Sequence, residues 1–242
     1  MKLAIKSLIG AGLAFAAASS ALAVPVSISD NYVGADAHGW GDRIGNSSYE
    51  VRSMDVSFDA TFMNVRIFTN FNQATDPYGT LFGDLFISTN GWHPYGAAPY
   101  TQDDASNGEH WEYVFDTSQN RLYGGAFTIL LSDNAPPEVS DPSRYVVRNG
   151  QEVLRNNGGV AFAGSSVDLS HAGNNGYIDY HILIASLNLS SNAELGLKWA
   201  MSCANDVIAG QVAYSRVPEP GTLALLGLGL LGLGLTQRRK AS

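Results

Sequence analysis

The chain has 242 residues and a formal net charge of −8 at neutral pH. Between Val24 and Arg216 it holds 21 acidic residues against 9 basic ones, a net charge of −12. A surface of that charge repels nucleic acid and anionic lipid headgroups, and it is compatible with neutral sugars, Ca²⁺ or cationic partners. With Cys203 as the one cysteine, an intrachain disulfide is excluded; we expect this thiol to be buried, with an intermolecular bond as the alternative.

The first 23 residues have the three parts of a secretory signal peptide. Two lysines come first, an apolar stretch follows, and the small residues Ala21 and Ala23 form a cleavage site. We therefore expect residues 1–23 to be removed on export, so that the mature chain begins near Val24. A buried N-terminal helix or an uncleaved anchor is the alternative.

Residues 24–216 are long enough for one domain, and their patterning indicates β-structure. Period-two alternation of apolar and polar residues is clearest at 65–71, 177–184 and 194–201. Further strands are expected at 50–59, 80–89, 110–116, 122–131, 144–148 and 160–169. Turn signals separate them, among them Asn90-Gly91, Asn149-Gly150 and Asn157-Gly158-Gly159. Because no convincing amphipathic helix appears, the pattern predicts an all-β fold, a single jelly-roll-like β-sandwich.

Three segments of this domain, MDVSFDATFMNVRIFTNF, GDLFIST and LGLKWAMSCANDVIAG, carry a resemblance to known sandwiches. They look like the strand order of DOMON-like domains and related carbohydrate-binding modules. The resemblance implies the sandwich fold more than any ligand, because sandwiches host many functions. Haem-binding members of that group use Met and His axial ligands, for which Met201 and His181 are the available residues; no sequence pattern brings the two together.

Residues 91–113, GWHPYGAAPYTQDDASNGEHWEY, crowd aromatic side chains into a segment rich in Gly and Pro. Flat aromatic rings stack on the apolar faces of sugars while nearby polar groups bind hydroxyls. Glycan binding is therefore one hypothesis for four residues of this segment: Trp92, Tyr95, Tyr100 and Trp111. The alternative is that the rings cover the core or fix the loop.

Four oxygen-bearing residues cluster around Gly108 in the same segment: Asp103, Asp104, Asn107 and Glu109. Ca²⁺ takes six to eight oxygen ligands, and acidic loops supply them. We expect no cofactor, with Ca²⁺ bound by these four residues as the alternative. The spacing does not match the EF-hand pattern, and a solvated turn is the alternative.

No catalytic motif stands out. The five histidines form no His-x-x-x-His or His-Glu-x-x-His pattern, and no Gly-x-Ser-x-Gly elbow is present. We therefore expect a protein that is not an enzyme. A pair of carboxylates for glycoside hydrolysis would leave no spacing to find in the sequence, so a polysaccharide hydrolase stays as an alternative.

Residues 217–242 have three parts in order. The segment 217–221 holds Val217-Pro218-Glu219-Pro220, whose prolines fix an extended backbone. Residues 222–236 are expected to form a transmembrane helix, although 14 apolar residues span only roughly 21 Å against about 30 Å of hydrocarbon. The final segment 237–242 contains Arg238, Arg239 and Lys240, which the positive-inside rule places in the cytoplasm.

This arrangement resembles the PEP-CTERM sorting signal of Gram-negative bacteria, with Pro218, Glu219 and Pro220 matching its first part. The resemblance covers about the last 26 residues and implies processing by an exosortase, a membrane enzyme. The tail would then be a transient inner-membrane anchor, and the destination would be the cell surface or the extracellular matrix. A plain C-terminal anchor is the alternative.

Proteins with this signal typically accompany exopolysaccharide and biofilm production. The resemblance thus implies an exported, non-enzymatic surface or matrix protein whose partner is exopolysaccharide or another matrix component. The alternatives are a structural or adhesive protein that binds other proteins or itself, and a matrix polysaccharide hydrolase.

Overall fold

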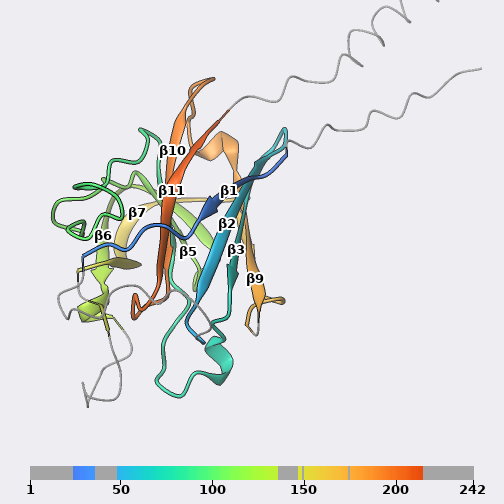
Figure 1. Ribbon diagram of the computed structural model, residues 1–242. Helices are drawn as coiled ribbons and strands as arrows, with labels where there is room; N and C mark the ends of the chain where they lie inside the picture. Colours follow the sequence, from blue (N-terminus) through green and yellow to red (C-terminus); the bar gives the residue numbers. More distant parts are fainter. Residues whose placement is uncertain (1–23, 36–47, 136–146, 149, 174, 215–242) are drawn as a thin grey trace, which may run out of the picture. The chain divides into compact units, whose positions relative to one another are not determined.

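The computed structural model describes residues 24–35, 48–135, 147–148, 150–173 and 175–214 (Figure 1). The expected signal peptide, 1–23, and the expected sorting segment, 217–242, lie outside the described residues. The described part is an all-β sandwich, which confirms the fold predicted from period-two alternation.

The described residues form eleven strands and three short 3-10 helices. The strands are β1 (Val26–Ser29), β2 (Val51–Phe58), β3 (Phe62–Thr69), β4 (Leu85–Ser88), β5 (Tyr113–Asp116), β6 (Arg121–Leu131), β7 (Glu152–Phe162), β8 (Ser166–Asp168), β9 (Gly176–Leu183), β10 (Glu194–Ala200) and β11 (Val207–Ala213). The 3-10 helices are η1 (Gln73–Thr75), η2 (Ser132–Asn134) and η3 (Ile184–Ser186).

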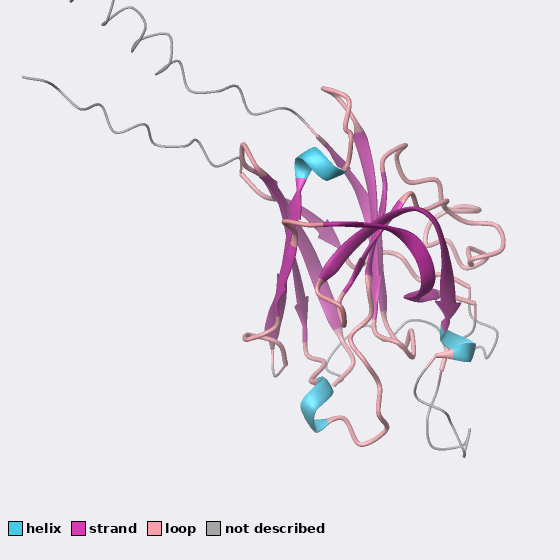
Figure 2. Ribbon diagram, turned by 180° about the vertical axis from the view of Figure 1, so that it is seen from behind, coloured by secondary structure: helices cyan, strands magenta, loops and turns pink. Residues whose placement is uncertain are grey.

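The strands assemble into two antiparallel sheets. The five-stranded sheet has the order β1-β2-β3-β9-β8, and the six-stranded sheet has the order β11-β10-β4-β5-β6-β7. Strands β7 and β8 follow each other in the chain but belong to different sheets, so the chain changes layers between them. Figure 2 shows how strongly β6 curves before it ends at η2.

The main core lies between the two sheets. Every second residue of β3 is buried, as expected of a strand with one face on the core. Trp199 of β10 is fully buried, and its Nε1 donates hydrogen bonds to the Tyr180 hydroxyl of β9 (3.0 Å) and to the Gly83 carbonyl (3.1 Å). This side chain therefore ties one sheet to the other through hydrogen bonds as well as through packing.

Two carboxylates are buried near this contact. Asp84, 1% exposed, accepts hydrogen bonds from the backbone N–H groups of Thr117 (2.8 Å) and Arg155 (2.6 Å). The Arg155 guanidinium lies 2.9 Å from Asp116, and its Cζ lies over the Tyr123 ring, 3.7 Å from the ring centre. Burial raises the pKa of Asp84 to about 7, although the two backbone donors lower it.

A second hydrophobic cluster covers the outer face of the six-stranded sheet. It includes Tyr32, Ala200 and Val207, with Trp92 and Tyr100 packed against it. The segment 89–111 supplies these last two rings, so it acts as a roof over this face of the sheet. Both faces of the central strands are therefore buried, which explains why β4 is buried at every position.

Several of the predicted turns and strands differ from those that the structure contains. The expected turn at Asn157-Gly158-Gly159 lies inside β7, where Gly158 and Gly159 take positive φ (79° and 80°) and the register with β6 shifts. The expected strand 160–169 is broken between β7 and β8, with Gly164 at φ 94° in the turn. Residues 147–148, the described part of the expected strand 144–148, are in no strand, and β1 and β11 were not predicted.

Candidate functional site

The segment 89–111 holds most of the residues that the sequence proposed for binding. Trp92, Tyr100 and Tyr32 form one aromatic cluster, with ring centroids 5.1 to 6.1 Å apart. The Trp92 backbone N–H donates to the Gln211 side chain of β11 (3.0 Å), which fixes the segment to the sheet. Trp92 and Tyr100 are therefore placed as packing groups of the roof.

Tyr95 differs from these two rings, because 51% of it is exposed. Its backbone N–H donates to Asp103, so the position of the residue is fixed while the ring stays accessible. The four predicted aromatic residues thus separate into two packed rings, one exposed ring and Trp111, which lines a groove.

The groove at Trp111 has a volume of about 400 Å³. One side is strand β6, which offers a mostly apolar wall made of Gly125, Ala126, Phe127, Ile129 and Leu131. The other side is the end of the roof segment: Ala105, Glu109, His110 and Trp111. Glu152 of β7 also lines it. We call this set of residues the Trp111 groove.

Strand β6 can form this wall because it is bulged and curved. Its register with β7 shifts between Gly124 and Phe127, and Gly125 takes φ 79°, a conformation that side chains rarely adopt. Such bulges increase local twist and bend a strand. In the sequence, the Gly124-Gly125 pair is the feature that signals this bulge, but no site was predicted from it.

A buried ion pair holds Trp111 in place. The Trp111 Nε1 donates to Glu152 Oε1 (3.2 Å), and the other oxygen of Glu152 binds the Lys198 ammonium. Lys198 also donates to Gln151 (2.8 Å) and lies 5.5 Å from the centre of the Tyr32 ring. Because the Lys198 and Glu152 side chains are only 3% and 4% exposed, the indole is fixed by groups that water barely reaches.

The second carboxylate of the groove, Glu109, braces the roof. Its oxygens accept hydrogen bonds from the backbone N–H groups of His93 and His110, and from the Ser88 hydroxyl (3.3 Å). Its side chain is 7% exposed. Both carboxylates of the groove are therefore engaged in internal bonds.

The four residues predicted to bind calcium are also engaged inside the segment. Asp103 accepts from the Tyr32 hydroxyl (2.6 Å) and Asp104 accepts from Ser106. Asn107 accepts from the Asp104 backbone (3.0 Å), and Glu109 binds as described above. These bonds hold the turn together from within the segment, and calcium binding, like the solvated turn named as its alternative, stays a prediction.

A different acidic group comes together at the strand ends. Asp30 follows β1, Glu50 precedes β2 and Asp206 precedes β11, and one oxygen from each lies within 4.8 Å of the others. Asp206 also accepts a hydrogen bond from the Val51 backbone (2.6 Å). Sequence reasoning missed this group because its members are far apart in the chain and only strand pairing unites them.

The remaining residues that the sequence analysis singled out lie partly in the core and partly outside the described residues. Cys203 is buried in the main core, as expected. Met201 is buried in that core too, whereas His181 lies 2.7 Å from Asn64 on a partly buried site of the five-stranded sheet. The cleavage residues Ala21 and Ala23, the segment Val217–Pro220 and the basic residues Arg238–Lys240 lie outside the described residues.

Comparison with known proteins gives one match, in the C-terminal segment of the chain. Residues 216–240 match the family model of the PEP-CTERM protein-sorting motif. Neither the curated proteins nor the solved structures contain a match to this chain, so the DOMON-like resemblance is unconfirmed. Within the described residues, no helix has the length and apolar character needed to cross a bilayer, and the expected span 222–236 is not among them. The sorting motif at residues 216–240 marks this chain as an exosortase-dependent exported surface protein.

Proposed function

We propose that the domain is a non-enzymatic glycan-binding module that attaches the exported protein to neutral exopolysaccharide of the surface or biofilm matrix. The Trp111 groove carries this proposal. It combines an indole fixed by Glu152, an apolar wall of β6 and a polar edge at the exposed residue His110. This is the combination that sugar rings require, an aromatic face for their C–H groups and polar groups for their hydroxyls.

The charge of the body supports a neutral ligand. Two carboxylates line the groove, and the stretch from Val24 to Arg216 has a net charge of −12. A polysaccharide rich in uronic acids would be repelled by this field, whereas neutral chains would not.

The bonding of the carboxylates supports a role without catalysis. Glycoside hydrolysis needs one carboxyl group to give a proton and another to attack or to activate water. Glu152 is bound to Lys198 and Trp111, and Glu109 to the roof backbone, so neither is presented to a glycosidic bond. Product release from a bound polysaccharide, lost in Glu109→Gln, would instead favour a hydrolase.

An adhesive function is the second candidate, and one observation favours it. Strand β7 is an edge strand of the six-stranded sheet, and its Val160 is 67% exposed. Exposed edges of sheets are sites where other chains can add a strand. Self-association that Val160→Lys abolishes, without glycan affinity, would support this function in place of the first.

The decisive experiment measures affinity for a panel of neutral polysaccharides, such as dextran, xylan and galactomannan, and for the host's own exopolysaccharide. Trp111→Ala should weaken binding about thirtyfold, since a central aromatic anchor contributes about 2 kcal/mol. Tyr95→Ala is the matched control, because this ring is exposed and lies outside the groove, and it should change affinity less than twofold. Equal effects of the two changes, at unchanged melting temperature, would contradict the groove.

The sorting part of the proposal concerns the two ends of the chain. We propose that residues 1–23 are cleaved, that 222–236 anchor the protein transiently, and that the exosortase cuts near Pro218–Gly221. Intact mass of the secreted protein, with and without the host's exosortase, tests this. A mature protein that still contains Arg238, Arg239 and Lys240 in both strains would indicate a plain anchor.

A further inference from the structure

The two ends of the sandwich differ in what they carry. Val26 pairs with Val56 near the end of β2, and Tyr214 contacts Phe58 with ring centroids 5.1 Å apart. The first and last described residues of the domain are therefore at the Phe58 end (Figure 1). The eight residues of β2 span roughly 26 Å, so the Val51 end is distant from Tyr214, the last described residue of the domain.

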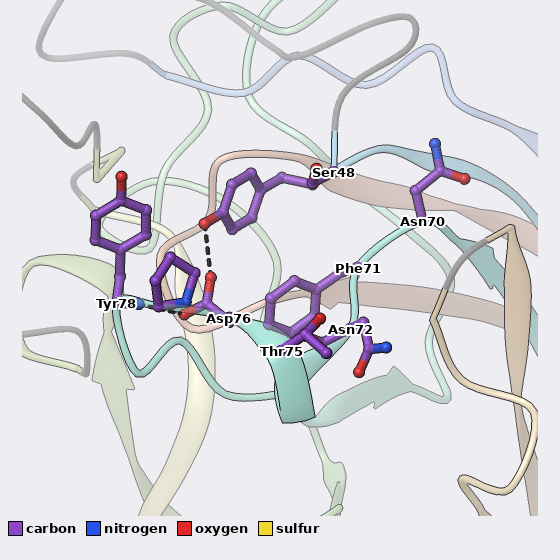
Figure 3. Close-up of a pocket in the computed structure, with 9 residues that line it drawn as sticks. Ser48, Asn70, Phe71, Asn72, Thr75, Asp76 and Tyr78 are labelled. Carbon is purple, nitrogen blue, oxygen red and sulfur yellow. Dashed lines mark hydrogen bonds between the residues drawn. The ribbon is translucent and has the colours of Figure 1, made fainter.

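A pocket of about 280 Å³ opens at this distant end, beyond β3 and around η1 (Figure 3). We call it the tip pocket. The residues used below are Tyr49, Phe71, Asn72, Asp76 and Tyr78, and Asn70 and Ser48 also line it. The tip pocket and the Trp111 groove share no residue.

The pocket is built on a fixed aromatic base. Phe71 is 1% exposed, and the Tyr49 ring stacks on it at 5.7 Å with an interplanar angle of 23°. The Tyr49 hydroxyl donates to Asp76 Oδ1 (2.6 Å). Burial, with the Asp76 carboxylate adding to it, raises the pKa of Tyr49 above its usual value, so this phenol remains a proton donor at all physiological pH values.

Asp76 organises the rim as well. Its second oxygen accepts hydrogen bonds from the backbone N–H groups of Tyr78 (3.0 Å) and Thr80 (2.8 Å). One carboxylate thus fixes both the Tyr49 ring and the backbone that carries Tyr78. Tyr78 itself is 46% exposed.

Amide groups stand across the pocket from Tyr78. Figure 3 shows Asn70 and Asn72 on the opposite side of Phe71 from Tyr78. The Asn72 side-chain oxygen accepts from the Ala74 backbone (3.1 Å) and caps η1, which orients the amide. A partly exposed tyrosine at one edge of the pocket and an oriented amide, that of Asn72, at another suit a polyhydroxylated ring, because an aromatic ring can stack on a sugar and an amide can bind its hydroxyls.

The volume of the tip pocket and the charge around it limit the kinds of ligand that it can bind. The volume is at the lower limit of ordinary ligand sites, about 300 Å³, so the pocket has room for one sugar ring rather than a chain. Asp76 is an acid, and Glu50 and Asp206 lie at the same end of the sandwich. Anionic sugars are therefore disfavoured.

We propose that the tip pocket is a second carbohydrate site, which binds the terminal residue of a neutral glycan independently of the Trp111 groove. The inference rests on the proposed affinity for polysaccharide, but it uses no residue of the groove. One domain with a site for chain interiors and a site for chain ends can join two polysaccharide molecules. Such a bivalent protein would cross-link the matrix rather than only bind to it.

The test uses the exported, processed protein and simple probes. Methyl glycosides of glucose, galactose, mannose and N-acetylglucosamine are screened by saturation-transfer NMR, and affinity is then measured for those that bind. We expect Tyr78→Ala to weaken glycoside binding about tenfold, the effect of losing one stacking contact. Tyr78→Phe should keep it, and Tyr95→Ala, the control, should not change it.

The outcomes separate the two sites. Loss of glycoside binding in Tyr78→Ala with polysaccharide binding retained, and the reverse in Trp111→Ala, would support both sites. Absence of glycoside binding in the unchanged protein, or binding that Tyr78→Ala leaves intact, would overturn the tip pocket whatever Trp111→Ala does. If Trp111→Ala is without effect while Tyr78→Ala abolishes glycoside binding, the tip pocket stands and the groove proposal fails.

Discussion

The outer face of each sheet carries an ion pair whose cation lies over an aromatic ring, but one pair is buried and the other is exposed. On the six-stranded sheet, Lys198 pairs with Glu152 and lies 5.5 Å from the centre of the Tyr32 ring. On the five-stranded sheet, Arg66 pairs with Asp179 at 2.7 Å and lies 4.0 Å from the centre of the Tyr177 ring. The roof segment 89–111 covers the first pair, and the second pair is open to water.

Burial decides what each pair contributes. The Lys198 and Glu152 side chains are 3% and 4% exposed, against 44% and 17% for Arg66 and Asp179. A buried pair loses most of its hydration, so breaking it leaves an uncompensated charge, whereas an exposed pair is replaced by water. The buried pair also positions Trp111, which links the stability of the roofed face to the proposed glycan site.

The largest effect is expected for Lys198→Ala. It leaves Glu152 buried without its cation and should lower the free energy of unfolding by about 3–5 kcal/mol, as urea denaturation would measure. The double change Lys198→Met with Glu152→Gln removes both charges and should be less destabilising than the single change. A cost below about 1 kcal/mol for Lys198→Ala would mean that this pair behaves like a surface pair.

The next effect concerns pH and a buried carboxylate of the six-stranded sheet. Asp84 has a pKa raised from 3.8 to about 7, chiefly by burial. Between about pH 4 and pH 7 the folded protein keeps a proton that the unfolded chain has released. The free energy of unfolding therefore falls as pH rises through this window, by an amount of the order of 4 kcal/mol, and this contribution is constant above it.

Asp84→Asn isolates this dependence. The amide offers one oxygen to the two backbone donors, Thr117 and Arg155, so the variant is less stable at every pH. Because it does not ionise, its deficit relative to the unchanged protein should be larger at pH 5 than at pH 8. Chemical denaturation at the two values measures the difference, and an equal deficit at both would contradict a raised pKa.

The fold was predictable because most strands bury one face. Period-two alternation located β3 and β9, since each packs one side on the core. It also located β10, whose residues 194–201 alternate in sequence although both faces of the strand are buried. Strand β11 was missed because its first four residues, Val207–Gly210, are all buried and form an apolar run without alternation. The Asn157-Gly158-Gly159 segment was predicted as a turn, but it lies in a bulged part of β7. Glycines with positive φ occur in bulges as well as in turns, so their presence in the sequence does not distinguish the two.

The candidate site was predictable only in part. Composition pointed to the segment 91–113, and Trp111 does line a groove. The packing of Trp92 and Tyr100 depends on Tyr32, a residue from a different part of the chain, so no local pattern could show it. The tip pocket has polar residues of ordinary loop type, and its aromatic base appears only when Tyr49 and Phe71 meet at the ends of neighbouring strands.

The smallest effect tests the open face. Arg66→Ala removes an ion pair and a cation–π contact that water can replace, so it should cost only about 0.5–1 kcal/mol of unfolding free energy. A double-mutant cycle with Asp179→Ala, at low and at high salt, measures the coupling between the two side chains. We expect a coupling below about 1 kcal/mol that shrinks with salt, because exposed charges are screened. A coupling of several kcal/mol that salt leaves unchanged would show that the open face also desolvates its pair, and burial under the roof would then no longer explain the difference between the two faces.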